Sequence, residues 1–181
     1  MRRGRAYVRL LAGASRTERV ARLRKTGVDM QPNELARKMC EEVYGQGKVE
    51  LISQLIGDDY TGHDPIAGKL SRSTIEANVQ QYRRAFPDLS MQVIDQMSSG
   101  DKGMIRWRAT GTHRGELLGA KPTNKKVTIE GISEVRCVNG RIAEEWLQWD
   151  ALGMLRQIGV VPEMAAPKRD GAGRPEVSKH R

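Results

Sequence analysis

The strongest constraint on the fold is the Asn139-Gly140 dipeptide, which separates two long runs of alternating side chains. A type I′ turn needs positive φ at both central residues, and Asn followed by Gly tolerates this better than most pairs. Residues 126–138 and 141–149 are therefore predicted to form an antiparallel hairpin. Two further strand-like runs precede it, at 89–97 and 104–112.

Three amphipathic helices are predicted before these strands. Asn33 is the expected N-cap of the first helix, which ends at Gly45, and residues 48–56 form the second. The third begins at the capping-box sequence Ser73–Glu76 and ends before Pro87, because proline cannot continue a helix. Helices thus occupy the first half of the folded region, and strands the second.

A short helix is predicted after the last strand. Asp150 can act as its N-cap, and Gly159 suits the left-handed residue that follows a helix. Helices followed by a long antiparallel meander indicate an α+β fold, with the helices packed on one face of a strongly curved sheet. Such a sheet encloses a cavity on its concave side.

Strand alternation predicts which side chains line that cavity. On the two central runs, one face is mainly apolar and the other mainly charged, so the apolar face is expected to point inward. The inward residues are predicted to be Ile105, Trp107, Ala109, Gly111 and His113 on one strand, and Ile129, Gly131, Ser133, Val135 and Cys137 on the next. In 141–149 both faces mix apolar and charged residues, so periodicity leaves its inner face open.

The basic charge of the chain lies outside the predicted domain. The sequence has a formal net charge of +9 and a pI near 9.9, a balance that can indicate a nucleic-acid partner. Residues 1–29 carry nine basic and two acidic side chains, residues 30–163 carry 17 and 18, and residues 164–181 carry five and two. Because nucleic-acid binding needs basic residues on a folded face, we expect no such partner.

Residues 30–163 are predicted to form one domain, with a basic, disordered extension at 1–29 and a disordered tail at 164–181. The Arg-rich start also fits an organellar transit peptide, but Arg9 interrupts the apolar run that a signal peptide needs. No apolar run approaches the roughly 18 residues of a membrane span. We expect a cytoplasmic protein without membrane association.

Four ionisable side chains are candidates for proton transfer. His113 ends an apolar face beside glycines and could lean over the cavity, or could only hydrogen-bond the following turn. His63 and Asp64 could orient each other in a predicted loop, although Asp-Pro is also an ordinary turn sequence. If Glu145 points inward, its carboxyl would have a raised pKa and could act as an acid or a base.

Aromatic residues supply a candidate ligand wall. Trp107, Trp146 and Trp149 lie on two predicted strands and could stack against a flat ligand, with core packing as the alternative. No metal site is expected, because the spacing of His63, Asp64 and His113 matches no recognised pattern. The sequence also has no phosphate-binding loop, so we expect no cofactor.

Five segments of the sequence occur in an order that is typical of one protein family, although no single segment identifies that family. They are Asp59–Pro65, Arg84–Leu89, Gly111–Gly119, Glu145–Asp150 and Leu155–Gly159. Together they resemble the SnoaL-like polyketide cyclases, or ester cyclases, of the nuclear transport factor 2-like superfamily, over residues 33–161. The resemblance implies a cone-shaped fold with three helices on the concave face of the sheet, an internal small-molecule pocket and a homodimer.

The same resemblance exposes a departure from the family pattern. In the antibiotic-pathway cyclases, an aspartate on the last strand acts as acid and base in an aldol closure, and an inward histidine on the preceding strand assists it. Leu147 and Ser133 occupy those two positions here. Leucine cannot move a proton, so the specific aldol mechanism is in doubt while the pocket is expected to remain.

The expected function is binding of a small, apolar, carbonyl-containing molecule, with cofactor-free acid/base cyclisation or isomerisation if the protein is an enzyme. The proton carriers would come from His113, His63, Asp64 and Glu145, and the ligand-binding residues are expected to be Trp107, Ser133, Leu147 and Trp149. The alternative is a non-catalytic ligand-binding or dimerisation module, which Leu147 favours.

Overall fold

The predicted hairpin forms the centre of the fold in the computed structural model, which describes residues 30–162. Asn139 and Gly140 both have positive φ, at 52° and 74°, and join two strands that pair antiparallel. The two preceding strands continue the antiparallel meander, as expected. These strands are β3 (Ser90–Ser99), β4 (Lys102–Thr112), β5 (Lys126–Val138) and β6 (Arg141–Trp149).

Two strands were not predicted. β1 (Ile56–Asp64) and β2 (Gly68–Ser71) extend the sheet to six strands in the order β2-β1-β6-β5-β4-β3. β1 pairs parallel with β6, and every other neighbouring pair is antiparallel. The second helix, predicted at 48–56, is present as a 3-10 turn at Val49–Leu51 that continues into α4 (Ile52–Leu55), and Ile56 belongs to β1 instead. The consecutive Gly57, Asp58 and Asp59 are poor strand formers, which hid β1 in the sequence.

The first helix begins two residues earlier than predicted. Gln31, not Asn33, is the N-cap of α3 (Pro32–Lys38), and its backbone N–H donates to Glu34 Oε2 at 3.0 Å. Asn33 instead ties the helix to the β3–β4 hairpin, because its Oδ1 accepts a hydrogen bond from Ser98 Oγ at 2.8 Å. The helix continues as a π-helix over Met39–Tyr44, a distortion that occurs frequently at functional sites.

The remaining helices end where the sequence indicated. α5 (Ile75–Ala85) stops before Pro87, although its N-cap Thr74 forms no side-chain capping bond to the helix. α6 (Ala151–Ile158) begins at Asp150, whose Oδ1 accepts the Gly153 N–H at 2.7 Å, and it ends at the left-handed Gly159. Within residues 30–162, no helix is long and apolar enough to cross a membrane.

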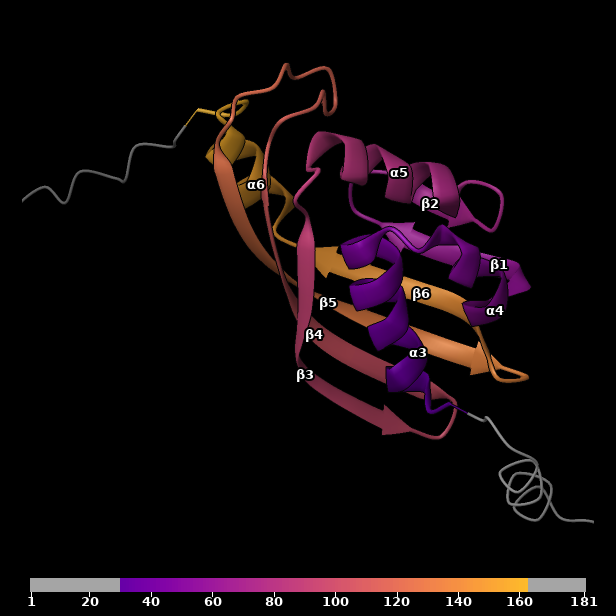
Figure 1. Cartoon of the computed structure of the whole chain (residues 1–181). Helices are drawn as coiled ribbons and strands as arrows, with labels where there is room; N and C mark the ends of the chain where they lie inside the picture. Colours follow the sequence, from indigo (N-terminus) through magenta and orange to yellow (C-terminus); the bar gives the residue numbers. More distant parts are fainter. Residues whose placement is uncertain (1–29, 163–181) are drawn as a thin grey trace, which may run out of the picture.

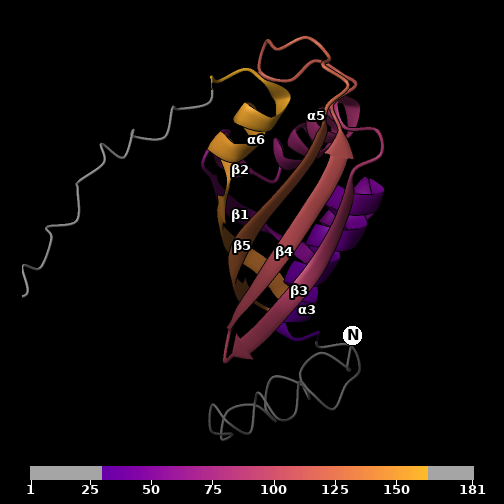
Figure 2. The ribbon, with the colours of Figure 1, turned by 90° about the vertical axis from the view of Figure 1, so that its left-hand side faces the viewer.

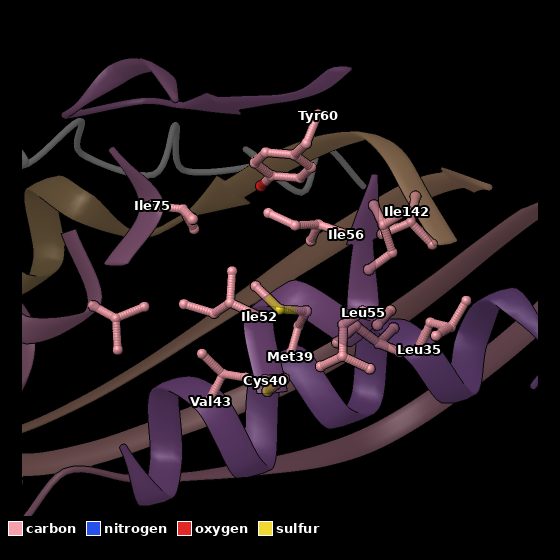
Figure 3. Close-up of a cluster of buried hydrophobic side chains, with 14 of the residues drawn as sticks. Leu35, Met39, Cys40, Val43, Ile52, Leu55, Ile56, Tyr60, Ile75 and Ile142 are labelled. Atoms are coloured by element: carbon pink, nitrogen blue, oxygen red, sulfur yellow. The ribbon is translucent and has the colours of Figure 1, made fainter. Parts of the chain in front are cut away.

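The helices cover the concave face of the sheet. Figures 1 and 2 show α3 and α5 lying inside the curve that β3, β4, β5 and β6 form. The main apolar cluster fills the space between them: Leu35, Met39 and Val43 point from the helical side toward Ile56 and Ile142 on the strands (Figure 3). The fold is therefore the predicted α+β cone, and the predicted segments 1–29 and 164–181 lie outside the described residues.

The inner face of the meander follows the alternation of the sequence. Ile105, Trp107 and Ala109 on β4 are buried, and Val135 on β5 is fully buried. The outer face is charged, with ion pairs that join neighbouring strands. These pairs are Arg106–Glu130, Arg108–Glu130, Lys102–Glu134 and Arg136–Glu144.

The homodimer that the resemblance implies stays a prediction, and we expect it to form through this outer face, where the charges of neighbouring strands are complementary. Ile132 lies among the charged residues of the face and is 42% exposed, so an isologous contact could bury it at its centre. We expect a dimer by light scattering at tens of micromolar, and a shift to monomer in Ile132→Lys. Leu152→Lys is the matched control, because Leu152 is 47% exposed but lies on α6. If light scattering shows that the unmodified protein is a monomer, the proposed interface is wrong.

Candidate active site

An apolar cavity of about 80 Å³ lies between the concave face of the sheet, α5 and the π-helix. This volume is several times the roughly 10–15 Å³ that one water molecule needs. Its wall combines methionines, aliphatic side chains and five aromatic rings, which belong to Tyr44, Tyr82, Phe86, Trp107 and Trp149. Two carboxyl groups, those of Asp64 and Glu145, reach this mainly apolar wall.

The register of the β5–β6 hairpin resolves the face of β6 that the sequence left open. Ser133 pairs with Leu147 and Val135 pairs with Glu145, which puts Glu145, Leu147 and Trp149 on the concave side. The pairing of β5 with β6 shifts register between Arg136 and Cys137, on the side of these pairs that is nearer the turn. Because strand side chains alternate, a slip of one residue would turn Glu145 toward solvent.

Glu145 is buried, with 4% of its surface exposed. Its Oε2 accepts a hydrogen bond from the Tyr60 hydroxyl at 2.8 Å. The pKa of the Glu145 carboxyl is raised from 4.5 to about 7, mainly by burial and to a smaller extent by the nearby Asp64 carboxylate. Hydrogen bonds from Tyr60 and Ser133 act in the opposite direction but do not cancel this rise in pKa. Glu145 can therefore both accept and donate a proton near neutral pH.

Gly62 makes the contact between Tyr60 and Glu145 possible. It pairs with Glu145 across the parallel β1–β6 ladder, and Tyr60 lies two residues before it on the same face. A Cβ at position 62 would stand 2.6 Å from the Tyr60 hydroxyl oxygen. The missing side chain thus leaves room for the hydroxyl to reach the carboxyl group on the next strand.

Asp64 has a different environment from Glu145. Its Oδ1 accepts the backbone N–H groups of Ile66 and Ala67 at 2.8 and 2.7 Å, and its Oδ2 accepts Trp149 Nε1–H at 3.1 Å. Three N–H donors stabilise the charged form of a carboxylate. The two carboxyl groups of the cavity therefore differ in their hydrogen-bond partners, with N–H donors on Asp64 and a tyrosine hydroxyl on Glu145.

A chain of hydrogen bonds fixes the opposite side of Glu145. Trp107 Nε1 donates to Ser133 Oγ at 3.1 Å, and the Ser133 side chain hydrogen-bonds Glu145. The Trp107 ring occupies the space above Gly131, where a Cβ would collide with it. The predicted ligand-binding residues Trp107, Ser133, Leu147 and Trp149 all line the cavity.

Three polar groups of the site were not predicted from the sequence. Tyr60 was hidden because β1 was not recognised as a strand. Tyr44 and Asn78 hydrogen-bond each other at 2.9 Å between Tyr44 Oη and Asn78 Oδ1, and both line the cavity. Burial raises the pKa of the Tyr44 hydroxyl well above its usual range. Asn78 follows Ile75 by three residues on the buried side of α5, which is the only sequence signal for it.

His63 lies on the outer face of the sheet. Its ring stacks on Trp146 with 5.5 Å between ring centroids, and its Nε2 is 3.1 Å from Glu144 Oε1. Asp64, the next residue, points to the opposite face because strand side chains alternate. The structure therefore separates the predicted pair His63 and Asp64, and His63 does not line the cavity.

His113 is fully buried, but it too lies outside the cavity lining. Its Nδ1 is 3.1 Å from Thr123 Oγ1, and its ring packs against Phe86 at 5.5 Å. Its Nε2 has no hydrogen-bond partner among the described residues. This placement matches the alternative in which the imidazole hydrogen-bonds a nearby loop, and neither histidine adjoins the cavity.

Within residues 30–162, no group of three or more His, Cys, Asp and Glu side chains is arranged to hold a metal ion. Cys40 contributes a thiol to the cavity wall, and burial raises its pKa above the usual range. A thiol of this kind is a poor nucleophile. Proton transfer by Glu145 is the chemistry that the residues of the cavity can perform themselves.

Comparisons with known proteins agree with this architecture. The family model for SnoaL-like polyketide cyclases matches residues 34–158. IdmH, a candidate polyketide cyclase from Streptomyces antibioticus, is 27% identical, with a TM-score of 0.62 over 72% of this chain and 99% of that one. No curated protein sequence matches significantly.

Two further crystal structures show the same fold at lower identity. A candidate polyketide cyclase from Acidithiobacillus ferrooxidans is 24% identical, with a TM-score of 0.62 over 74% of this chain and 97% of that one. A candidate SnoaL-like polyketide cyclase from Jannaschia is 19% identical, with a TM-score of 0.65 over 75% of this chain and all of that one.

The raised pKa of Glu145 predicts a specific pH dependence of stability. The folded protein binds this proton more tightly than the unfolded chain, so the stabilisation is complete below about pH 4.5 and is lost as pH rises through about 7. Between these limits the loss amounts to about 3 kcal/mol of unfolding free energy. Urea unfolding should show this slope in the unmodified protein and not in Glu145→Gln. If the unfolding free energies of the two proteins change with pH in parallel, the raised pKa does not belong to Glu145. Glu134→Gln, on the outer face, is the control and should keep the pH dependence of the unmodified protein.

Proposed function

The chain belongs to the SnoaL-like polyketide cyclase family, and on that premise we propose that its cavity binds a small, largely apolar, carbonyl-containing molecule. Glu145 is the acid and base in this proposal, and no cofactor is needed for the step that it carries out. The reaction class is proton abstraction next to a carbonyl group, followed by isomerisation or cyclisation.

The observation that carries this proposal is a carboxyl group with a pKa of about 7 inside an apolar cavity. A buried carboxyl without a function costs stability at neutral pH, since its charged form is poorly solvated. Perturbed groups of this kind concentrate in active sites. A general base is most effective when its pKa lies near the working pH, which is the case for Glu145.

The neighbours of Glu145 have defined tasks in the proposal. Tyr60 and Ser133 orient the carboxyl group through hydrogen bonds, and the carboxylate of Asp64 keeps its pKa high. Trp107 and Trp149 form the apolar wall that positions the ligand and excludes water. A proton taken from carbon by Glu145 can be returned to a different atom of the bound molecule, because the protonated carboxyl group stays buried beside it.

A non-catalytic ligand-binding module is the second candidate. Leu147 and Ser133 stand opposite each other on the cavity wall, at the positions where the resemblance implies an aspartate and a histidine. An apolar residue at the first position favours binding without the aldol chemistry of the family. The two candidates differ in whether Glu145 transfers a proton, so a direct test of its basicity separates them.

Nitrobenzisoxazole tests that basicity without knowledge of the natural substrate. A carboxylate removes the ring C–H proton, the C–H electron pair forms the nitrile, and the N–O bond breaks, so that the ring opens to a single coloured product, a cyanonitrophenolate. We expect turnover above buffer that increases as pH rises through about 7, since only ionised Glu145 accepts the proton. Glu145→Gln should lower the rate by about 100-fold or more.

The matched control for this assay is Glu134→Gln, which removes an exposed carboxylate on the outer face and should keep the full rate. An unchanged rate in Glu145→Gln would remove Glu145 as the base. Turnover that is absent in the unmodified protein, together with binding of the probe detected by quenching of tryptophan fluorescence, would favour the non-catalytic module.

The departure at Leu147 gives a separate prediction. The unmodified protein should not turn over a polyketide aldol substrate, because the wall is apolar where that reaction needs a proton carrier. Leu147→Asp alone should not create robust activity, since Ser133 supplies no assisting imidazole, and it should lower the unfolding free energy by about 2–4 kcal/mol. An aldol-cyclisation assay and urea unfolding check these outcomes. Turnover by the unmodified protein would show that Leu147 does not disable this route.

A further inference from the structure

The cavity contains negative groups but no positive one. Asp64 and Glu145 both reach its wall, and none of its lining residues is Lys, Arg or His. Among the described ion pairs, none involves either carboxyl group. The charged residues of the outer face, by contrast, are paired with opposite charges across neighbouring strands.

This imbalance is unusual for buried charge. A buried carboxylate is stabilised by hydrogen bonds, by a cation or by both, and Asp64 has three N–H donors but, among the described residues, no cationic partner. Its negative charge therefore extends into the cavity, where it already raises the pKa of Glu145. A ligand with a positive charge would relieve both groups, whereas an anionic ligand would be repelled by both.

The aromatic rings of the cavity wall also favour a positively charged ligand. Five rings surround the cavity, and the faces of aromatic rings attract organic cations. The Trp149 indole N–H donates to the Asp64 carboxylate, which increases the electron density of the ring and strengthens that attraction. Tyr82 meets Trp149 edge to face, with 6.2 Å between the ring centroids, so two rings border the same region.

We propose that the ligand of this cavity is an organic cation, a small molecule with a protonated or quaternary amine held between Asp64, Glu145 and the face of Trp149. This inference deepens the proposed function and rests on it, because it adds a charged group to the ligand of the same site. The apolar part of the ligand lies against the methionines and aliphatic side chains, and its amine selects it over neutral and acidic molecules of the same shape.

Binding of a cation is coupled to ionisation of Glu145. The titratable groups that face this carboxyl are those of Tyr60 and Asp64 from β1, and of Cys40 and Tyr44 from the π-helix. Burial raises the pKa values of the Cys40 thiol and of both tyrosine hydroxyls above their usual ranges, so these three groups stay neutral near pH 7. A bound cation favours the ionised form of Glu145, and affinity for it should therefore increase with pH.

Three probes of one shape test the charge preference. Choline is the cation, neohexyl alcohol is its neutral analogue with carbon in place of nitrogen, and the anion of tert-butylacetic acid is the negative member. Titration calorimetry and quenching of tryptophan fluorescence measure their affinities. At about pH 8 we expect choline to bind about 10-fold or more tightly than the alcohol, and the anion to bind least. Choline affinity should fall by several-fold at about pH 6, while the affinity of the alcohol stays nearly constant.

Variants assign the effect to the two carboxyl groups. Glu145→Gln should lose the pH dependence of choline binding, and Asp64→Asn should reduce the preference for choline at both pH values. Should Asp64→Asn fail to fold, because Asp64 also holds the β1–β2 turn, Glu145→Gln and the pH series still decide the question. Glu134→Gln is the control and should leave all three affinities unchanged.

The outcomes separate this inference from the proposed function. Equal affinities for choline and the alcohol, or tighter binding of the anion, would overturn the preference for a cation and leave the cavity as a ligand site. A preference for choline that Glu145→Gln and Asp64→Asn both retain would place the cation elsewhere and overturn the inference. Absence of binding for all three probes would count against the ligand site itself, and with it against both proposals.

Discussion

The register of the β5–β6 hairpin is the constraint on which the rest of the site depends. The Asn139-Gly140 turn joins the two strands, and the register shift beside Arg136 then places Glu145 on the concave face. Side chains alternate along a strand, so every inward residue of β6 moves together if the pairing slips by one position. Burial of Leu147 and partial burial of Trp149 on the same face oppose such a slip, since both would be exposed by it.

Two carboxyl groups on one cavity wall behave differently because their donors differ. Asp64 accepts hydrogen bonds from three N–H groups, which stabilise a negative charge. Glu145 instead accepts hydrogen bonds from hydroxyl groups and lies in an apolar setting, where burial raises its pKa to about 7. The charge on Asp64 then adds to the rise in the pKa of Glu145. One proton is thus left exchangeable near neutrality, at the carboxyl group that adjoins the cavity and the hydrogen-bonded Ser133.

Much of the fold could be predicted from the sequence, since its strongest signals are local. The turn at Asn139-Gly140, the helix stop at Pro87 and the cap at Asp150 each depend on a few adjacent residues, and the structure confirms them. β1 could not be predicted in the same way. Its stability comes from pairing with β6, a partner about 80 residues away, and its own sequence contains poor strand formers. His63 and Asp64 therefore look like loop neighbours in the sequence but lie on opposite faces of the sheet.

The candidate site depends most on β1, the strand that could not be predicted from the sequence. Parallel pairing of β1 with β6 places Gly62 beside Glu145, so that Tyr60 and Asp64, two residues away on either side, flank the same carboxyl group. Without β1, the Glu145 carboxyl would lack both its tyrosine donor and its negative neighbour. Local signals thus determine where the carboxyl group lies, whereas the tyrosine donor and the negative neighbour that adjust its pKa come from a long-range parallel contact that periodicity cannot reveal.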